Sequence, residues 1–177
     1  MRRGRKPVVV DTNVPITANR RNGGSYACAS ACAQELMALR KSGTLVLDRG
    51  GLILAEYRNY LNYKGEPGAG DAFFRWFFNN RGKTDLCREI PITPIAHQWR
   101  QFEEFPDDET LSNFDKADQK FVSAAIAVKQ GASVLQASDH KWLNWHNSLE
   151  AHGVEVRFLC KAELFATQNR KKAVDVS

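Results

Sequence analysis

The chain has 177 residues, of which 43% are hydrophobic and 25% charged, a balance typical of one soluble globular domain and not of a disordered or fibrous chain. No apolar run approaches the ~20 residues that a membrane-spanning helix needs, so we expect no membrane partner. The basic start MRRGRK resembles the first part of a signal peptide. The apolar PVVV that follows reaches Asp11 before it attains the ~7–15 apolar residues of such a peptide, so we expect a cytoplasmic protein.

The net charge of +5 is concentrated at the two ends of the chain. Residues 1–6 carry four positive charges, and residues 168–177 carry three positive charges and one negative, which leaves the body near −1. We expect a single domain over 7–165, with a basic N-terminal tail over 1–6 and a basic C-terminal tail over 166–177. The basic tails can bind anionic phosphate groups, whereas the body attracts such groups only if cations neutralise its acidic residues.

Short runs rich in Val, Leu and Ile alternate along the chain with longer runs of helical period. The strand-like runs cover 7–11, 44–48, 87–92, 133–137 and 154–158. Helical patterns fill the intervals, near 26–42, 51–63, 70–81, 94–104, 115–130 and 142–152. This alternation predicts an α/β fold, a three-layer α/β/α sandwich with a short, mainly parallel central sheet.

Acidic residues stand at or near the ends of the predicted strands. Asp11 follows the valine run, and Asp139 follows SVLQAS in the same way. Since ligands of such sheets bind beyond the carboxyl ends of the strands, both acids should face one crevice. Glu56 is interior to the helical run GGLILAEYRNYL, and Asp115 and Asp118 open the run DKADQKFVSAAIAV. The last two also suit the start of a helix without any further function.

Carboxylates that meet in one crevice repel one another unless a cation lies among them. Oxygen ligands suit the hard cations Mg²⁺ and Mn²⁺, and two such ions ~4 Å apart are the usual device for in-line attack on a phosphodiester. Two divalent ions would also change the charge of the body from about −1 to about +3. We therefore predict that Asp11 is a metal ligand.

These residues resemble those of the PIN-domain nucleases, the PIN-like ribonucleases that include VapC-like toxins. The similar segments are VVVDTN, LVLDRGGLILAEYRNYL, DKADQKFVSAAI and VLQASDHKWL, and together they cover most of residues 7–160. The resemblance implies a compact α/β/α fold and a divalent-metal-dependent endoribonuclease. It implies that the catalytic, metal-binding acids are Asp11, Glu56, Asp118 and Asp139, with Asp115 as an auxiliary acid at the metal.

The resemblance also assigns polar residues around these acids. Thr12, Asn13 and Ser138 match the positions beside the first and last acids, where they could orient a carboxylate or a water molecule. His140 and Lys141 are a prediction from position and not from the resemblance: they directly follow the last acid, where they could bind the scissile phosphate.

Tyr60 lies four residues after Glu56 on the same helix face, where its ring could stack on an unpaired base. The alternative is that this tyrosine closes the core.

An aromatic run, DAFFRWFFNN at 71–80, has more apolar surface than one helix face needs. It fits either a fully buried helix or an interface with a second copy or an inhibitory antitoxin. The four cysteines, in contrast, lack the paired spacing of a zinc site or a disulfide framework, and we expect them to be small buried side chains. They are Cys28, Cys32, Cys87 and Cys160.

Three functions compete for this sequence. The first is a metal-dependent ribonuclease, which would include the toxin of a toxin-antitoxin pair. The second is a PIN-like scaffold that binds RNA without cleaving it, although a complete set of acids favours catalysis. The third is a phosphatase of the haloacid dehalogenase type, but its D-x-D chemistry needs an acid where this chain has Asn13.

Overall fold

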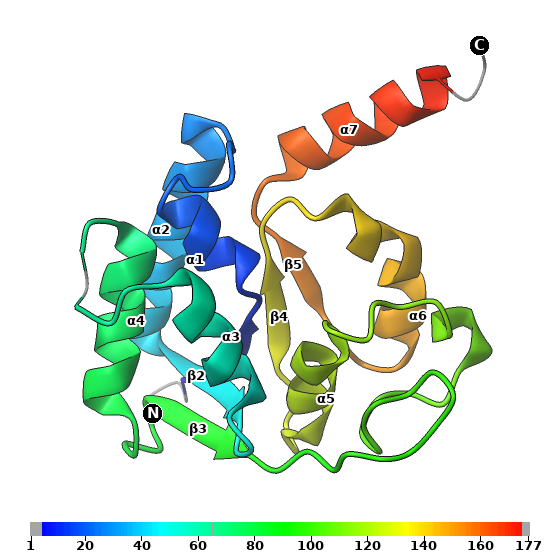
Figure 1. The fold of residues 1–177 in the computed structure, drawn as a ribbon, viewed down its shortest axis with the longest axis horizontal. Coiled ribbons are helices and arrows are strands. Elements are labelled where there is room, and N and C mark those ends of the chain that lie inside the picture. The colour runs from blue at the N-terminus through cyan, green and yellow to red at the C-terminus, as the bar shows by residue number, and fades with distance from the viewer. Residues whose placement is uncertain (1–4, 65, 175–177) are drawn as a thin grey trace.

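The computed structural model describes residues 5–64 and 66–174, and a five-stranded sheet lies at its centre (Figure 1). All strands pair in parallel, in the spatial order β3-β2-β1-β4-β5. The strands are β1 (Lys6–Val10), β2 (Gly43–Asp48), β3 (Cys87–Ile90), β4 (Ser133–Gln136) and β5 (Val156–Phe158). The predicted α/β fold with a parallel central sheet is confirmed.

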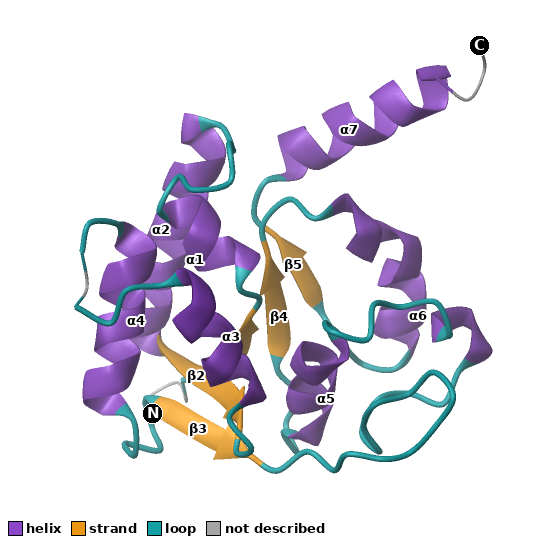
Figure 2. Cartoon of the chain, in the orientation of Figure 1, coloured by secondary structure: helices purple, strands orange, loops and turns teal. Residues whose placement is uncertain are grey.

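Helices surround the sheet in Figure 2 and complete the three-layer α/β/α fold. The α-helices are α1 (Asn13–Ala18), α2 (Tyr26–Ser42), α3 (Leu52–Tyr60), α4 (Ala69–Asn80), α5 (Gln119–Ala127), α6 (His146–Ala151) and α7 (Lys161–Val174). Two 3₁₀ helices are η1 (Glu109–Leu111) and η2 (His140–Trp145).

The order of the strands reverses beside β1. The chain passes from β1 outward to β2 and β3, and it then returns to the other side of β1 to form β4 and β5. Because such crossovers are right-handed, α1, α2 and α4 cover one face of the sheet and α5 covers the other. Helix α2 packs with α1 and α4, while α5 packs on β1, β2 and β4 and contacts α3. The carboxyl ends of β1 and β4 therefore form the switch point, where ligands of such sheets bind.

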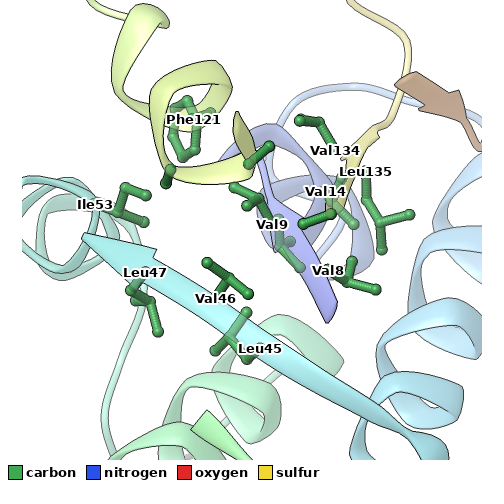
Figure 3. Packing of buried hydrophobic residues seen from close by; sticks show 14 of the residues in the cluster. Val8, Val9, Val14, Leu45, Val46, Leu47, Ile53, Phe121, Val134 and Leu135 are labelled. Carbon is green, nitrogen blue, oxygen red and sulfur yellow. The ribbon is translucent and has the colours of Figure 1, made fainter. Parts of the chain in front are cut away.

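The core forms because both faces of the central strands are covered. All six residues of β2 are buried, and Val9 and Val10 of β1 have no exposed surface. Figure 3 shows Phe121 of α5 and Ile53 of α3 packed with the aliphatic side chains of β1, β2 and β4. Strands buried on both faces need continuous apolar runs, which is what VVV and LVL supply.

The helix expected over 94–104 does not form. In this described segment the backbone N–H of Ile95 donates to the carbonyl of Gln101 (3.0 Å), and that of Glu103 donates to the carbonyl of Thr93 (2.9 Å). The segment is thus a small antiparallel turn in which Pro94 pairs with Phe102. The helical prediction over this range is wrong because cross-segment hydrogen bonds replace those along a helix.

Two helices lie where the sequence patterns indicate none. Helix α1 has six residues, too few to display a hydrophobic period, and it includes Pro15. Helix α7 begins at Lys161 and projects away from the other elements in Figure 1. The segment 166–177, expected to be a basic tail, is therefore helical to Val174, and 175–177 lie outside the described residues.

The expected N-terminal tail is described only from Arg5 onward. The guanidinium of Arg5 donates to the carbonyl of Gly43 (2.7 Å) and to that of Lys41 (3.0 Å), which binds it to the end of α2. Lys6 already belongs to β1.

The aromatic run forms α4, and the fold uses most of its apolar surface. Phe73, Phe74 and Phe77 are fully buried, whereas Phe78 is exposed. Close packing of α4 on α1 depends on Gly70, since a Cβ there would lie 2.1 Å from the carbonyl oxygen of Pro15. Most of the aromatic surface therefore stabilises the monomer.

The cysteines depart from the expectation that all four are plain buried side chains. Cys28 of α2 and Cys160, the residue before α7, form a disulfide, while Cys32 and Cys87 are buried free thiols. The pairing joins residues 132 positions apart, so no local spacing could indicate it. Among the described residues, no helix is both long and apolar enough to cross a membrane.

Candidate functional site

Asp11 occupies the switch point of the sheet. It directly follows β1, and its backbone N–H donates to the carbonyl of Leu135 in β4 (3.0 Å), which continues the pairing of the two strands. The residue is 5% exposed, and its Oδ1 accepts the N–H of Asn13 (2.9 Å). The carboxylate is thus held in a nearly closed position at the carboxyl edge of the sheet.

The other predicted acids act electrostatically on Asp11. Burial raises the pKa of this carboxyl well above its usual range, and the charges of Asp118, Glu56 and Asp139 raise it further, against the hydrogen bond from Asn13. All four predicted catalytic acids therefore act on one another around the same edge of the sheet. The ionised cluster is unfavourable unless a positive charge enters it.

One positive charge is already present in the cluster. Lys120, in the first turn of α5, is 8% exposed, and its Nζ lies 2.5 Å from Oε2 of Glu56 on α3. The same ammonium donates to the carbonyl oxygen of Ala117. No sequence-based prediction included Lys120, although a lysine within the apolar run KFVSAAIAV is an unusual feature that could have indicated it.

Tyr57 holds α3 against the end of β1. Its hydroxyl donates to the carbonyl of Val10 (2.5 Å), and the ring is fully buried. Burial raises the pKa of this phenol, and the charges of Asp11 and Glu56 raise it further, so the hydroxyl stays protonated and can donate. Tyr57 thereby positions the neighbouring Glu56, a role that its place beside that acid could have indicated.

Asp48 ends β2 as Asp11 ends β1, but it has a different role. Its Oδ2 accepts the N–H of Leu52 (2.8 Å), and its Oδ1 accepts that of Ile53 (2.7 Å), at the start of α3. Both carboxylate oxygens are thus used to hold a helix terminus. This acid orients the helix that carries Glu56.

Asp118 stands at the start of α5 without capping it. Its side chain makes no capping bond; instead Oδ2 accepts the indole N–H of Trp142 (3.2 Å). Burial raises the pKa of Asp118 to about 6, and Asp115 and Asp139 add to the rise, while Lys120 opposes it. A carboxylate kept away from its helix terminus remains available to a ligand.

Asp115 does not begin a helix. It is exposed, and its Oδ1 accepts the N–H of Ala117 (2.9 Å), so it stabilises the turn before α5. The interpretation that Asp115 suits the start of a helix is wrong, since α5 begins four residues later. Its charge nevertheless acts on Asp118, which agrees with an auxiliary place beside the cluster.

The raised pKa of Asp118 predicts a pH-dependent stability without divalent ions. The pKa of this carboxyl is near 3.8 in the unfolded chain and about 6 in the folded protein, so its ionisation destabilises the folded state. The free energy of unfolding should therefore fall between pH 4 and pH 6 and stay low above pH 6. The two-unit shift corresponds to about 3 kcal/mol at most. Urea denaturation in EDTA at pH 4 and pH 7 measures this, and Asp118→Asn should show a smaller loss. An equal loss in the variant would contradict it.

Asp139 and its neighbours lie at the end of β4. Asp139 is partly exposed, and its Oδ1 accepts the N–H of Lys141 (3.0 Å) at the start of η2. Ser138 and His140 are partly exposed, and the Lys141 side chain is exposed. The predicted phosphate-binding residues therefore stand beside the acidic cluster.

Thr12 and Asn13 connect the ends of β1 and β4. Asn13 Oδ1 accepts the N–H of Ala137 (3.0 Å), and its amide donates to Gln136, a fully buried residue that the sequence analysis missed. Thr12 is 3% exposed, and its hydroxyl has no hydrogen-bond partner among the described protein atoms. A buried hydroxyl without a partner next to Asp11 is suited to a water molecule or a ligand.

The acids act on one another electrostatically without forming a tight group of three. Among the described residues, no three carboxylates bring oxygens within 4.8 Å of one another. This spacing fits a hard divalent cation that keeps several of its water molecules and binds only one or two carboxylates directly. Oxygen-only donors, the buried Asp11 and the unpartnered hydroxyl of Thr12 all agree with such a cation.

A groove of about 310 Å³ adjoins the cluster between α3 and the start of α5. Its lining includes Leu52, Glu56, Asn59, Gln101, Phe102 and Lys120. Tyr60 is 53% exposed and so is not a core residue, although the groove does not include it. A larger cavity of about 580 Å³, between α7, β5 and η2, contains none of the predicted acids.

No family model, no curated protein and no solved structure matches the chain. Any functional assignment therefore depends on the motifs and on the arrangement of the acids.

Proposed function

We propose that the protein is a divalent-metal-dependent endoribonuclease of the PIN-like type. One observation carries the proposal: the buried Asp11 lies at the switch point, where Asp118, Glu56 and Asp139 all raise its pKa. Carboxyl groups whose pKa is raised by burial and by neighbouring acids cluster at functional sites. RNA as the substrate class is supported by the motifs that resemble PIN-domain nucleases.

The acids proposed to hold Mg²⁺ or Mn²⁺, either directly or through its water molecules, are Asp11, Glu56, Asp118 and Asp139, with Asp115 close by. The cation would supply an activated water molecule and stabilise the leaving oxygen of the phosphodiester.

The chain's own residues then have positioning and binding roles. The N–H of Asn13 and the indole of Trp142 orient two of the carboxylates, and Tyr57 anchors the helix of the third. His140 and Lys141 are proposed to bind the RNA phosphates, and Tyr60 to stack on a base. Ser138 and Thr12 would hold water at the cluster.

We also propose that the protein is located in the cytoplasm and that it is a toxin whose activity an antitoxin inhibits. An interface through α4 could involve a second copy or the antitoxin, and it would use the exposed Phe78.

A PIN-like RNA-binding scaffold without catalysis is the alternative, and one contact favours it. The ion pair of Lys120 with Glu56 supplies a cation to the cluster without any metal. In a scaffold this ammonium would balance the acids permanently.

Incubation with mixed single-stranded and structured RNAs separates the two functions. We expect the wild type to cleave with Mg²⁺ or Mn²⁺ and not with EDTA. We expect Asp118→Asn to bind the same RNA but to cleave it more slowly by orders of magnitude, because binding depends on the basic residues and chemistry on the acids. Cleavage in EDTA, or RNA binding without cleavage under every metal, would contradict the ribonuclease.

A further inference from the structure

Three cysteine sulfurs meet on the side of the molecule where α2 and the start of α7 adjoin. The Sγ atoms of Cys28, Cys32 and Cys160 all lie within 4.8 Å of one another, and all three residues are buried. Cys28 and Cys160 share the disulfide, and the Sγ of Cys32 lies 3.9 Å from that of Cys160. None of the three belongs to the acidic cluster.

The local structure explains why these sulfurs meet. Ser25 caps α2 by accepting the N–H of Cys28 (3.1 Å), and the four-residue spacing then places Cys32 on the same helix face. Glu163, in the first turn of α7, accepts the N–H of Ser25 (2.9 Å). The carboxylate of Glu163 is therefore held at the N-terminus of α2, outside the 4.8 Å group of the three sulfurs, and it must turn toward them to bind the same ion.

We propose that Cys28, Cys32 and Cys160 form a thiolate site for a zinc-class divalent cation when the disulfide is reduced, with Glu163 as the fourth ligand. Cysteine thiolates and carboxylate oxygens are both zinc ligands, and three sulfurs with one oxygen complete the four-coordinate shell of such a cation. The 3.9 Å between Cys32 and Cys160 is near the ~3.8 Å separation of two sulfurs on a tetrahedral cation with 2.3 Å bonds. The site is independent of the proposed nuclease function.

The third thiol distinguishes this cluster from a plain disulfide. A disulfide needs two cysteines, yet Cys32 brings a third buried sulfur to within 3.9 Å of that of Cys160. A metal ion displaces the proton of a thiol that it binds, so Cys32 can add a third thiolate once the disulfide is reduced.

The disulfide state and the metal-bound thiolate state interconvert by a two-electron reduction and oxidation. A dithiol reductant gives two electrons and two protons to the Cys28–Cys160 bond and leaves as a cyclic disulfide. The cation then binds and releases the protons of the three thiols. Hydrogen peroxide reverses this by taking two electrons from the thiolates of Cys28 and Cys160 and two protons from the solvent, which re-forms the disulfide and yields two water molecules. The cation leaves, and Cys32 takes up a proton from the solvent. In both states α7 stays attached to α2.

Cobalt(II), a spectroscopic substitute for zinc, tests the site in the full chain. The protein is reduced with a phosphine, separated from it without oxygen, and titrated with Co²⁺. We expect one Co²⁺ per chain to give intense thiolate-to-cobalt charge-transfer absorption, and we expect Zn²⁺ or peroxide to abolish that absorption. Co²⁺ bound only at carboxylates lacks that absorption. Binding without charge transfer, or absorption that peroxide does not remove, would overturn the proposal.

Four variants locate the ligands. Cys32→Ser should keep the disulfide under oxidising conditions but lose the charge-transfer absorption after reduction. Glu163→Gln should weaken Co²⁺ binding by about tenfold or more, since even groups that only orient metal ligands contribute about 10–100-fold. Cys87→Ser and Asp11→Asn are the matched controls and should leave the absorption unchanged. Full absorption in Cys32→Ser would overturn the thiolate site, and unchanged affinity in Glu163→Gln would overturn the fourth ligand.

Discussion

Replacement of Asp11 by asparagine is expected to lower metal-dependent RNA cleavage by more than about a hundredfold. Residues that only orient metal ligands contribute about 10–100-fold each, and a proposed ligand should contribute more. The same change should raise the free energy of unfolding in EDTA, because it removes a buried charge that three other acids repel. Single-turnover cleavage at saturating RNA and urea denaturation in EDTA measure the two effects.

Asp48→Asn is the matched control, since it alters the other buried aspartate at the end of a neighbouring strand. Asparagine offers one acceptor oxygen where two helix N–H groups now bind the carboxylate. The variant should therefore lose about 1–3 kcal/mol of stability, the cost of an unsatisfied buried donor. If Asp11→Asn instead unfolds more easily than the wild type without metal, Asp11 is a structural partner and the proposed site is wrong.

Loss of the Cys28–Cys160 disulfide should produce the largest change in stability. The bond closes a loop across 132 positions, and the chain-entropy relation gives about 5 kcal/mol for a loop of that length. Urea denaturation in the presence of EDTA, with and without a phosphine reductant, measures the loss. The reductant should lower the urea midpoint of the wild type and should leave the midpoint of Cys160→Ser unchanged.

Cys87→Ser controls for the removal of a buried thiol. Cys87 is free and lies in β3, so its replacement should leave the effect of the reductant undiminished. A wild type whose midpoint does not respond to the reductant would show that the disulfide does not constrain the unfolded chain.

Much of the fold could be predicted because it depends on local patterns. Apolar runs such as VVV and LVL indicate strands buried on both faces, and the helical period between them indicates crossover helices. The rule for parallel sheets then predicts that Asp11 and Asp139 share one edge, as they do in the structure. The positions of Glu56 and Asp118 followed from the order of the motifs.

The turn at 94–104 shows where local patterns fail. Its sequence can satisfy a helical period, but its backbone groups bond across the turn, a choice that depends on the pairing of Pro94 with Phe102. Short α1 likewise depends on packing, since a six-residue helix is not stable alone.

The sequence by itself determined the parallel α/β framework and the edge at which the acids gather, because hydrophobic periodicity and chain direction are sufficient for both. Only the tertiary structure decided which acids belong to the cluster and which bind a helix terminus. Asp11 and Asp48 both end a valine- and leucine-rich strand, yet the first faces the other acids and the second binds the terminus of α3. The ion pair of Lys120 with Glu56 and the disulfide of Cys28 with Cys160 join segments distant in the chain. Such contacts depend on how helices pack over the sheet, and local patterns do not contain that information.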